Sequence, residues 1–389
     1  MNQKTSFVLA SVAALLTSLT ALPSDAQLGG RGAGAADIEL PPLRSVPAET
    51  MAAAVSDPDW QAPRTSWGDP SLEGVWSTDD MRSVPLSMRG GGPGNAGGAV
   101  DILSPIGEEE FLQRARSDEG GLERATERET FLRNEVGIRT FGYRSIVIDP
   151  PTGQMPSMTE AGRARASNSD RGTFGSGPFH SFVDFTLYDR CITRGVVGST
   201  LPVIYGNGLR ISQAPGKVAI TYEMIHDTRI VHLDDRPFVG DDIRQYMGNA
   251  RGRFEGDTLV VETRNFTDRT SIGVNGNGTP HSDALTLTER FTRVDPEMIE
   301  YHVTVDDPIA YEEPFTMRLM ITTHDDYEVY EYGCHEGNGA VGNSLSGERA
   351  YERQVQEAIA AGLPVPERGG SVYGPPQEGA EIFDINSGE

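Results

Sequence analysis

The stretch ALTLTERFTRVDPEMIEYHVTVD, residues 284–306, decides the fold. Apolar and polar side chains alternate through both of its halves, and the short turn sequence VDPE separates the two. In the second half, Tyr301, Val303 and Val305 share one face, and the residues between them are polar. Because successive side chains of a strand point to opposite faces, this stretch predicts two antiparallel strands, each with one buried face.

Further segments carry the same strand signals, namely alternation, β-branched or aromatic residues and flanking turn residues. They are RSIVID (144–149), HSFVDFTLY (180–188), VAITYEMI (218–225), RIVHL (229–233), DTLVVET (257–263), FTMRLMIT (315–322) and YEVYEYG (327–333). Strands in succession with short turns favour an antiparallel meander over βαβ units. Because closure removes exposed edges, we expect a mainly β chain folded as an antiparallel β-barrel, with a β-sandwich as the alternative.

Two segments predict peripheral helices. Pro105 lies at the start of the first, and acidic residues follow it in what would be the first turn. The second covers residues 346–362, with Ser346 as the capping residue and Gly362 as the stop. We therefore expect one or two helices at the periphery of the barrel.

The amino-terminal residues 1–26 have the parts of a secretory signal peptide. Lys4 supplies the positive charge, an apolar run follows, and small residues at positions 24 and 26 predict cleavage after Ala26. We therefore expect a periplasmic or secreted protein. The apolar run is too short and too polar for a membrane span, which needs about 18 residues or more, so we expect no stable membrane insertion.

Composition divides the rest of the chain into three parts. Residues 27–62 are rich in Gly, Ala and Pro and are expected to form a flexible linker. Residues 365–389 combine Pro, Gly and acidic residues and are expected to form an extended acidic tail. The strand signals lie between them, so residues 63–364 are expected to form a single barrel domain.

The formal net charge of the chain is −24 at pH 7. A chain this acidic repels the phosphates of nucleic acid and the surface of an anionic membrane. We therefore expect no nucleic-acid partner.

The chain has two cysteines, Cys191 and Cys334. In an oxidising compartment, two thiols favour a disulfide over a zinc pair or an activated thiol. A closed structural zinc site needs four ligands, and no CxxC or HxxxH spacing is present. We therefore expect a Cys191–Cys334 disulfide and no bound metal.

Several strings resemble known families. The Gly-x-Trp at residues 74–76 resembles the opening signature of lipocalin-like calycin barrels, and Trp76 is expected to contact a ligand of such a barrel. Longer strings resemble a large family of exported bacterial proteins without an assigned activity. They are SIVIDPPTGQMP (145–156), YDRCITRG (188–195), ITYEMIHDTRIVHLDDRP (220–237), RGRFEGDTLVVETRNFTDRT (251–270) and YGCHEGN (332–338). The resemblance covers residues 63–350 and implies one exported domain, but it brings no catalytic residues, and the calycin likeness implies only a fold.

The expected disulfide brings two distant motifs together. It places Asp189 and Arg190 beside His335 and Glu336. A cluster of arginine, histidine and carboxylates suits the binding of a carboxylate or the polarisation of a carbonyl, with His335 and Glu336 as candidate catalytic residues. The alternative is a salt-bridge network that stabilises the ends of the two loops.

His180 and Asp184 form a second candidate pair. If residues 180–188 form a strand, both side chains lie on the same face. A hydrogen bond between them would orient His180 as a general base, since imidazole is the usual acid–base group near neutral pH. The alternative is a polar outer face without a catalytic role.

Two carboxylates have apolar neighbours on their strand faces. Glu289 is expected to point inward, where it is either paired with an arginine, such as Arg318 or Arg253, or functional. Tyr222 is also expected to point inward. Glu223 lies on the opposite face, also among apolar residues, so we expect its pKa to be raised and its carboxyl to suit general-acid work.

A small antiparallel barrel commonly holds one small ligand. We therefore expect an exported barrel that binds a small, partly apolar molecule and acts on it by cofactor-independent proton transfer, as an isomerase, lyase or hydrolase. The alternative is a non-catalytic ligand-binding or envelope interaction protein. The sequence leaves open which of these is right, and it leaves the oligomeric state open.

Overall fold

The computed structural model describes residues 59–88, 102–107, 109–114, 139–168, 178–203, 206–273, 279–323 and 328–367. These residues belong to one compact unit of the chain, Leu43–Glu389. They form a mainly β structure with a closed barrel of nine strands and few helices.

The strands are β1 (Gly74–Ser77), β2 (Val147–Asp149), β3 (Gly208–Ala214), β4 (Lys217–Tyr222), β5 (Thr228–His232), β6 (Asn249–Glu255), β7 (Thr258–Arg264), β8 (Ser271–Ile272), β9 (Thr279–Pro280), β10 (Thr286–Asp295), β11 (Met298–Asp306) and β12 (Phe315–Thr322). The α-helices among the described residues include α3 (Glu160–Asn168), α4 (Gly195–Thr200) and α5 (Gly339–Ala361). Short 3-10 turns lie at Asp79–Met81, Phe182–Asp184 and Met224–His226.

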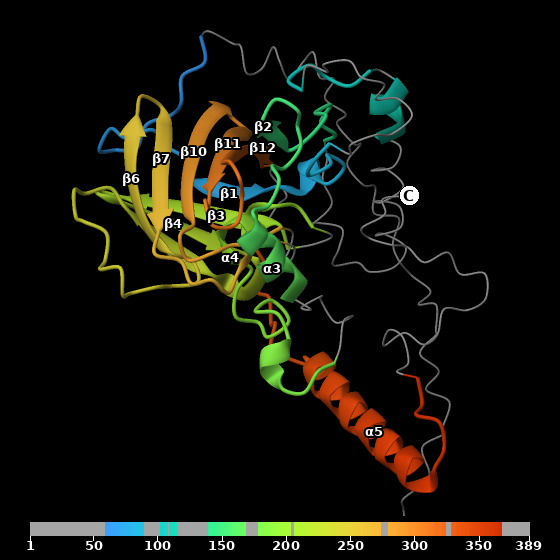
Figure 1. The fold of residues 1–389 in the computed structure, drawn as a ribbon. Helices are drawn as coiled ribbons and strands as arrows, with labels where there is room; N and C mark the ends of the chain where they lie inside the picture. The colour runs from blue at the N-terminus through green and yellow to red at the C-terminus, as the bar shows by residue number, and fades with distance from the viewer. Residues whose placement is uncertain are drawn as a thin grey trace, which may run out of the picture. The chain divides into compact units, whose positions relative to one another are not determined.

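The barrel follows the strand order β1-β3-β4-β5-β6-β7-β10-β11-β12. Strand β1 also pairs with β12, through Ser77 and Thr322, and this pairing closes the ring. Strand β2 pairs with β12 nearer its start, at Thr316 and Met317. Figure 1 shows β6, β7, β10 and β11 side by side along the barrel wall. The buried apolar side chains of these strands belong to one continuous core cluster.

The hairpin predicted from residues 284–306 is confirmed. Strands β10 and β11 pair antiparallel from Thr286 and Asp306 to the end of the hairpin, with a bulge between Arg293 and Asp295. Burial alternates along β11 as the side-chain pattern predicted, with Tyr301 at 0% exposure on the inner face. The period of two therefore places this hairpin correctly, including which side chains enter the core.

The prediction of a purely antiparallel barrel is wrong at one junction. Strands β5 and β6 pair parallel, through His232 and Arg251, so the barrel is mixed. The reason is the connection: residues 233–248 cross from the end of β5 to the start of β6 instead of making a tight hairpin. Arg251 anchors this crossover, since its guanidinium donates to the carbonyl oxygen of Pro237 at 2.6 Å.

Two of the predicted strands are wrong. Residues 180–188 form turns because the Asp184 carboxylate accepts the backbone N–H groups of His180 and Ser181, which closes the chain locally. Residues 328–333, the described part of the other segment, contain no strand. Two of their backbone N–H groups, those of Tyr330 and Tyr332, are bound by side chains, as described below.

Helix α4 is the main departure from the expected peripheral helices. All of its residues are buried, and Val196 and Val197 join the barrel core. Its first residue, Gly195, has a φ of +71°, and a Cβ there would lie 3.1 Å from the Thr270 Cβ. The sequence shows no helical periodicity here because a helix of six residues buried on all sides needs none.

The two predicted helices are present in part. Residues 109–114 are helical, as expected after Pro105. Helix α5 ends at Gly362, whose φ of +69° makes a left-handed cap, as predicted, but it begins at Gly339 instead of near residue 346. No helix among the described residues has the length and apolar character needed to cross a membrane.

The expected signal peptide, residues 1–26, lies outside the described residues, as do most of the linker (27–58) and most of the acidic tail (368–389). The expected barrel domain, residues 63–364, contains all of the strands.

Two helical glycines make a matched test of packing. A Cβ at Gly162 of α3 would meet the carbonyl oxygen of Ala310, whereas a Cβ at Gly347 of α5 would have no heavy atom within 4 Å. We expect Gly162→Ala to lower the free energy of unfolding by about 1–3 kcal/mol because α3 must move away from that turn. We expect Gly347→Ala to raise it by about 0.5–1 kcal/mol. Urea unfolding measures both, and equal effects would contradict the packing of α3.

Candidate functional site

The barrel encloses four polar side chains, which we call the internal ionic cluster. They come from four strands: Tyr222 from β4, Arg229 from β5, Glu289 from β10 and Tyr301 from β11. None is more than 5% exposed, and Glu289 and Tyr301 are at 0%. The alternation of each strand turns these side chains inward, where their neighbours are apolar.

Arg229 and Glu289 form a bidentate ion pair. Arg229 Nη1 donates to Glu289 Oε2 at 2.5 Å, and Nη2 donates to Oε1 at 2.6 Å. Tyr301 Oη also donates to Glu289 Oε1, at 2.9 Å. Strands β5 and β10 are not neighbours, since β6 and β7 lie between them in the sheet order. The ion pair therefore crosses the interior of the barrel.

Tyr222 completes the cluster. The Arg229 guanidinium lies 6.0 Å from the centroid of the Tyr222 ring. The Tyr222 hydroxyl hydrogen-bonds to Thr200, the last residue of α4, so the cluster is in contact with the buried helix.

Burial controls the protonation of these groups. It raises the pKa of Tyr222 and raises that of Tyr301 well above its ordinary value, and the nearby Glu289 carboxylate acts in the same direction. Burial alone would lower the pKa of Arg229, but the Glu289 carboxylate outweighs it and raises that pKa. At neutral pH the cluster therefore holds one cation and two protonated phenols, all of which can donate hydrogen bonds.

Glu289 points inward as predicted, and of the two alternatives left open the arginine pair is present, but the partner is neither of the two arginines suggested. Arg318 stacks on the Tyr143 ring at 4.0 Å, and Arg253 pairs with Glu255. Both arginines lie on outward positions of their strands, whereas Arg229 occupies an inward one.

Glu223 has a different environment from the one expected. It is buried at 2% exposure, and its two carboxylate oxygens accept backbone N–H groups of Gly208 at 3.1 Å and Tyr330 at 3.0 Å. His226 Nε2 accepts the N–H of Tyr332 at 2.9 Å. Glu223 and His226 thus hold residues 328–338, which we call the C-terminal strap, against the barrel.

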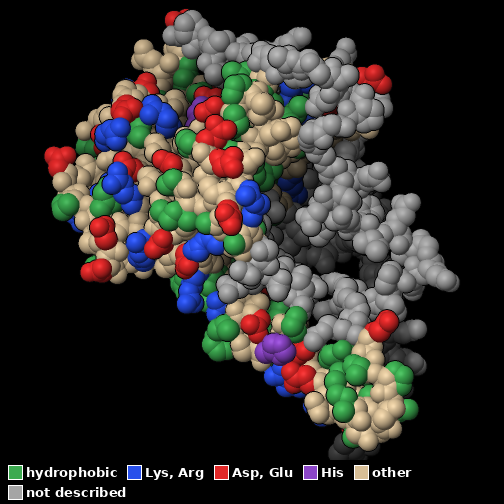
Figure 2. Space-filling model, in the orientation of Figure 1, with side chains coloured by type: hydrophobic (Ala, Val, Ile, Leu, Met, Phe, Trp, Pro, Cys, Tyr) green, Lys and Arg blue, Asp and Glu red, His purple; other side chains and the backbone are tan. Residues whose placement is uncertain are grey.

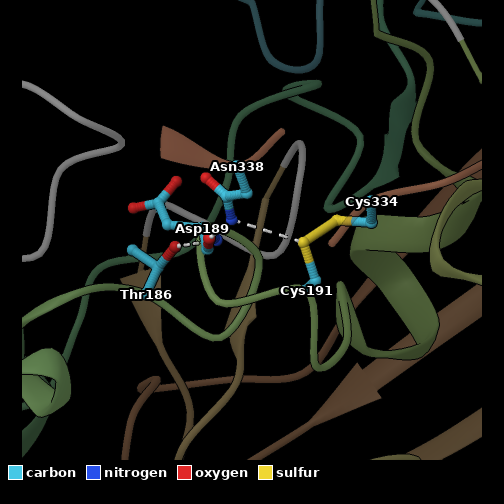
Figure 3. Close-up of a disulfide and its surroundings, with 5 residues drawn as sticks. All are labelled: Thr186, Asp189, Cys191, Cys334 and Asn338. Atoms are coloured by element: carbon cyan, nitrogen blue, oxygen red, sulfur yellow. Dashed lines mark hydrogen bonds between the residues drawn. A yellow bond between two sulfur atoms is a disulfide. The ribbon is translucent and has the colours of Figure 1, made fainter. Parts of the chain in front are cut away.

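The expected disulfide is present between Cys191 and Cys334, whose Cα atoms are 5.7 Å apart. Figure 3 shows Asn338 pointing at the Cys191 side of the bridge. Asn338 Nδ2 donates to the backbone oxygen of Asp189 at 3.0 Å and lies 3.6 Å from Cys191 Sγ. The disulfide therefore joins the two motifs, with Asn338 as the side chain that contacts Asp189.

The other predicted residues of this region differ in exposure. His335 and Glu336 are exposed on the strap, whereas Asp189 is buried at 2% exposure. The Arg190 guanidinium lies 5.8 Å from the centroid of the Phe182 ring. His180 and Asp184 do not form the predicted side-chain pair, because Asp184 accepts the backbone N–H of His180 at 2.8 Å.

Trp76 belongs to the barrel core. It is 1% exposed, and its Nε1 donates to the backbone oxygen of Leu72 at 3.0 Å. The Arg293 guanidinium lies 5.1 Å from the ring. These contacts make Trp76 a buried core residue of β1.

Sequence reasoning missed a pair of buried aspartates where β1 meets β12. Asp79 accepts hydrogen bonds from Arg82 at 2.6 Å and Asn207 at 2.7 Å. Asp80 accepts from Thr322 at 2.7 Å, and burial raises its pKa. Strand alternation cannot predict two adjacent buried acids, because they lie in a 3-10 turn. The Thr322 hydrogen bond ties the turn to β12, and the Asn207 hydrogen bond ties it to the start of β3, which indicates a structural role.

A second missed cluster contains His281, Ser282 and Asp307, all 1% exposed. The residue types match a Ser–His–Asp triad, but the hydrogen bonds do not. Ser282 Oγ donates to Asp307 Oδ1 at 2.7 Å, whereas the His281 ring pairs with Thr270 and the backbone oxygen of Ser282. The histidine is therefore not placed to take the serine proton.

His281 is expected to make the stability of the protein depend on pH. Burial lowers its pKa below 6.5, so between that lowered value and about 6.5 the unfolded chain binds a proton that the folded chain does not. We expect stability to fall as the pH drops below about 6.5, by at most about 1.4 kcal/mol per pH unit from this residue. Urea unfolding measures the difference in stability between pH 7.5 and pH 5.5. This difference should be smaller in His281→Gln than in the wild type, whereas His335→Gln, at an exposed site, should show the wild-type difference. The same difference in the wild type and in both variants would contradict the prediction.

Comparison of the chain with protein-family models, curated proteins and solved structures found no match.

Proposed function

We propose that this chain is an exported barrel protein of calycin type that binds one small, partly apolar molecule within the barrel. A carbonyl or hydroxyl group of that molecule would lie against the internal ionic cluster. The signal-like amino terminus and the Cys191–Cys334 disulfide support a periplasmic or secreted location.

The observation that carries this proposal is the bidentate pair of Arg229 and Glu289 at the centre of an apolar core. An ion pair buried in this way is often no more stabilising than apolar residues of the same volume, so stability alone does not explain it. Arg229 Nε is also buried and has no hydrogen-bond acceptor among the described residues. A ligand oxygen would satisfy that donor.

The cluster also suits proton transfer. A carbonyl oxygen beside Arg229 and the protonated Tyr222 would be polarised, and Glu289 would be the carboxylate that takes a proton from the adjacent carbon. This arrangement fits isomerase, lyase or hydrolase chemistry that uses no cofactor.

Ligand binding can be tested with the fluorescent probe N-phenyl-1-naphthylamine, with octan-2-one as the competitor. We expect one probe per chain, displaced by the ketone. Tyr222→Phe keeps the ring and removes the donor, so it should weaken the ketone several-fold and leave the probe unchanged. Tyr330→Phe, at a 44% exposed tyrosine, is the matched control. A wild-type protein that binds neither molecule would overturn the proposal.

A second candidate is a non-catalytic envelope interaction protein. The observation that favours it is the continuous apolar packing of the barrel interior, since a structural barrel has a filled interior. Absence of probe binding by a folded wild-type protein would favour this candidate over the first.

A further inference from the structure

Three metal-ligating side chains meet between helix α5 and the turn at residues 178–184. They are His180, Glu348 and Glu352, and one ligand atom of each lies within 4.8 Å of the others. His180 Nδ1 and Glu352 Oε1 are 3.3 Å apart. Figure 2 shows acidic, basic and histidine side chains gathered around the start of α5.

The backbone places these side chains before any ion binds. Glu348 and Glu352 are four residues apart on α5, so they lie one turn above each other on one face. The His180 carbonyl accepts Arg349 Nη1 at 3.1 Å, and the His180 N–H is held by Asp184 at 2.8 Å. The His180 carbonyl is therefore tied to the helix, and its N–H is held within the turn.

The ligand set combines one deeply buried carboxylate with two accessible groups. Glu348 is 6% exposed, whereas the side chains of His180 and Glu352 are 63% and 42% exposed. Arg349 pairs with Glu352 Oε1 at 2.6 Å, but a carboxylate has a second oxygen that can turn to a metal. An ion at this position would be partly shielded and would still exchange with solvent.

We propose that His180, Glu348 and Glu352 bind one divalent transition metal ion of the zinc class. One imidazole nitrogen and two carboxylate oxygens suit zinc, whereas calcium and magnesium prefer oxygen ligands alone. Around zinc at about 2.0–2.2 Å, ligand atoms lie about 3.4 Å apart. The His180–Glu352 pair already has this spacing, and the distances to Glu348, at most 4.8 Å, need to close by about 1.4 Å or less. Three protein ligands leave a fourth position for water.

The disulfide makes this site easier to assemble. Along the chain, His180 and Glu348 are 168 residues apart, but through the bridge the path is 11 residues to Cys191 and 14 residues from Cys334. Closing a shorter loop costs less entropy. The metal would thus add a second cross-link between the same two segments.

Isothermal titration of the chelator-treated full chain with zinc chloride tests the site. We expect one zinc ion bound tightly, and at least a tenfold loss of affinity in His180→Ala and in Glu352→Gln. His335→Ala, at another exposed histidine, should bind as the wild type does. Calcium and magnesium should not compete.

Two results would overturn the proposal: no zinc binding by the wild type, or binding that neither His180→Ala nor Glu352→Gln weakens, since that zinc lies elsewhere. Both replaced side chains are largely exposed, and an intact Cys191–Cys334 disulfide with cooperative unfolding verifies that each variant is folded. A second readout is limited proteolysis of α5, which zinc should slow in the wild type and not in His180→Ala.

Discussion

Replacing Arg229 with methionine is expected to lower the free energy of unfolding by about 3–5 kcal/mol. The substitution keeps much of the side-chain volume but leaves the Glu289 carboxylate, at 0% exposure, without its cation. Tyr301 still donates a hydrogen bond to it, but a neutral donor does not offset the cost of a buried charge. Urea unfolding at pH 7 measures the change.

The double variant Arg229→Met with Glu289→Leu is the control for this prediction. It removes both charges, so we expect it to recover most of the stability lost in the single variant. A double variant as unstable as the sum of the two single variants would contradict the ion pair. If the double variant folds but no longer binds ligand, that result would support a functional role for the cluster.

Replacing both Cys191 and Cys334 with alanine is expected to lower the free energy of unfolding by about 4–5 kcal/mol. The bridge closes a loop with a sequence separation of 143 residues, and the loss comes mainly from the freedom that the unfolded chain regains. Urea unfolding under oxidising conditions compares the double variant with the wild type.

Reduction of the wild type supplies the control. The reduced wild type and the double variant should unfold at the same urea concentration, because both lack the same covalent link. A loss below about 1 kcal/mol would show that the unfolded chain is already restrained in this region. The hydrogen bonds that Glu223 and His226 accept from the C-terminal strap should persist in the folded double cysteine variant.

The sequence predicts those parts of the fold that follow a period of two. The hairpin of β10 and β11 and the inward direction of Glu289 and Tyr222 follow from alternation alone. The partner of Glu289 does not, because Arg229 reaches it across the closed barrel, and closure depends on the order of strands that are distant in sequence.

The wrong predictions share a physical cause. Residues 180–188 and 328–333 have strand-like composition, but side chains such as Asp184 and Glu223 bind their backbone N–H groups in place of a neighbouring strand. The parallel entry of β6 depends on the path of residues 233–248, which carries no periodic signal. The buried aspartates at 79 and 80 depend on partners as distant as Thr322.

The strand pairing gives the barrel two weak lines. One residue pair joins β1 to β12, Ser77 with Thr322, and one joins β5 to β6, His232 with Arg251. Between these lines the wall consists of two antiparallel half-shells with long registers, β1 to β5 and β6 to β12. Arg229 belongs to one half-shell and Glu289 to the other, so their ion pair links the two half-shells across the interior. Separation along either line would break few backbone hydrogen bonds, so we expect local opening of the barrel to begin there before global unfolding.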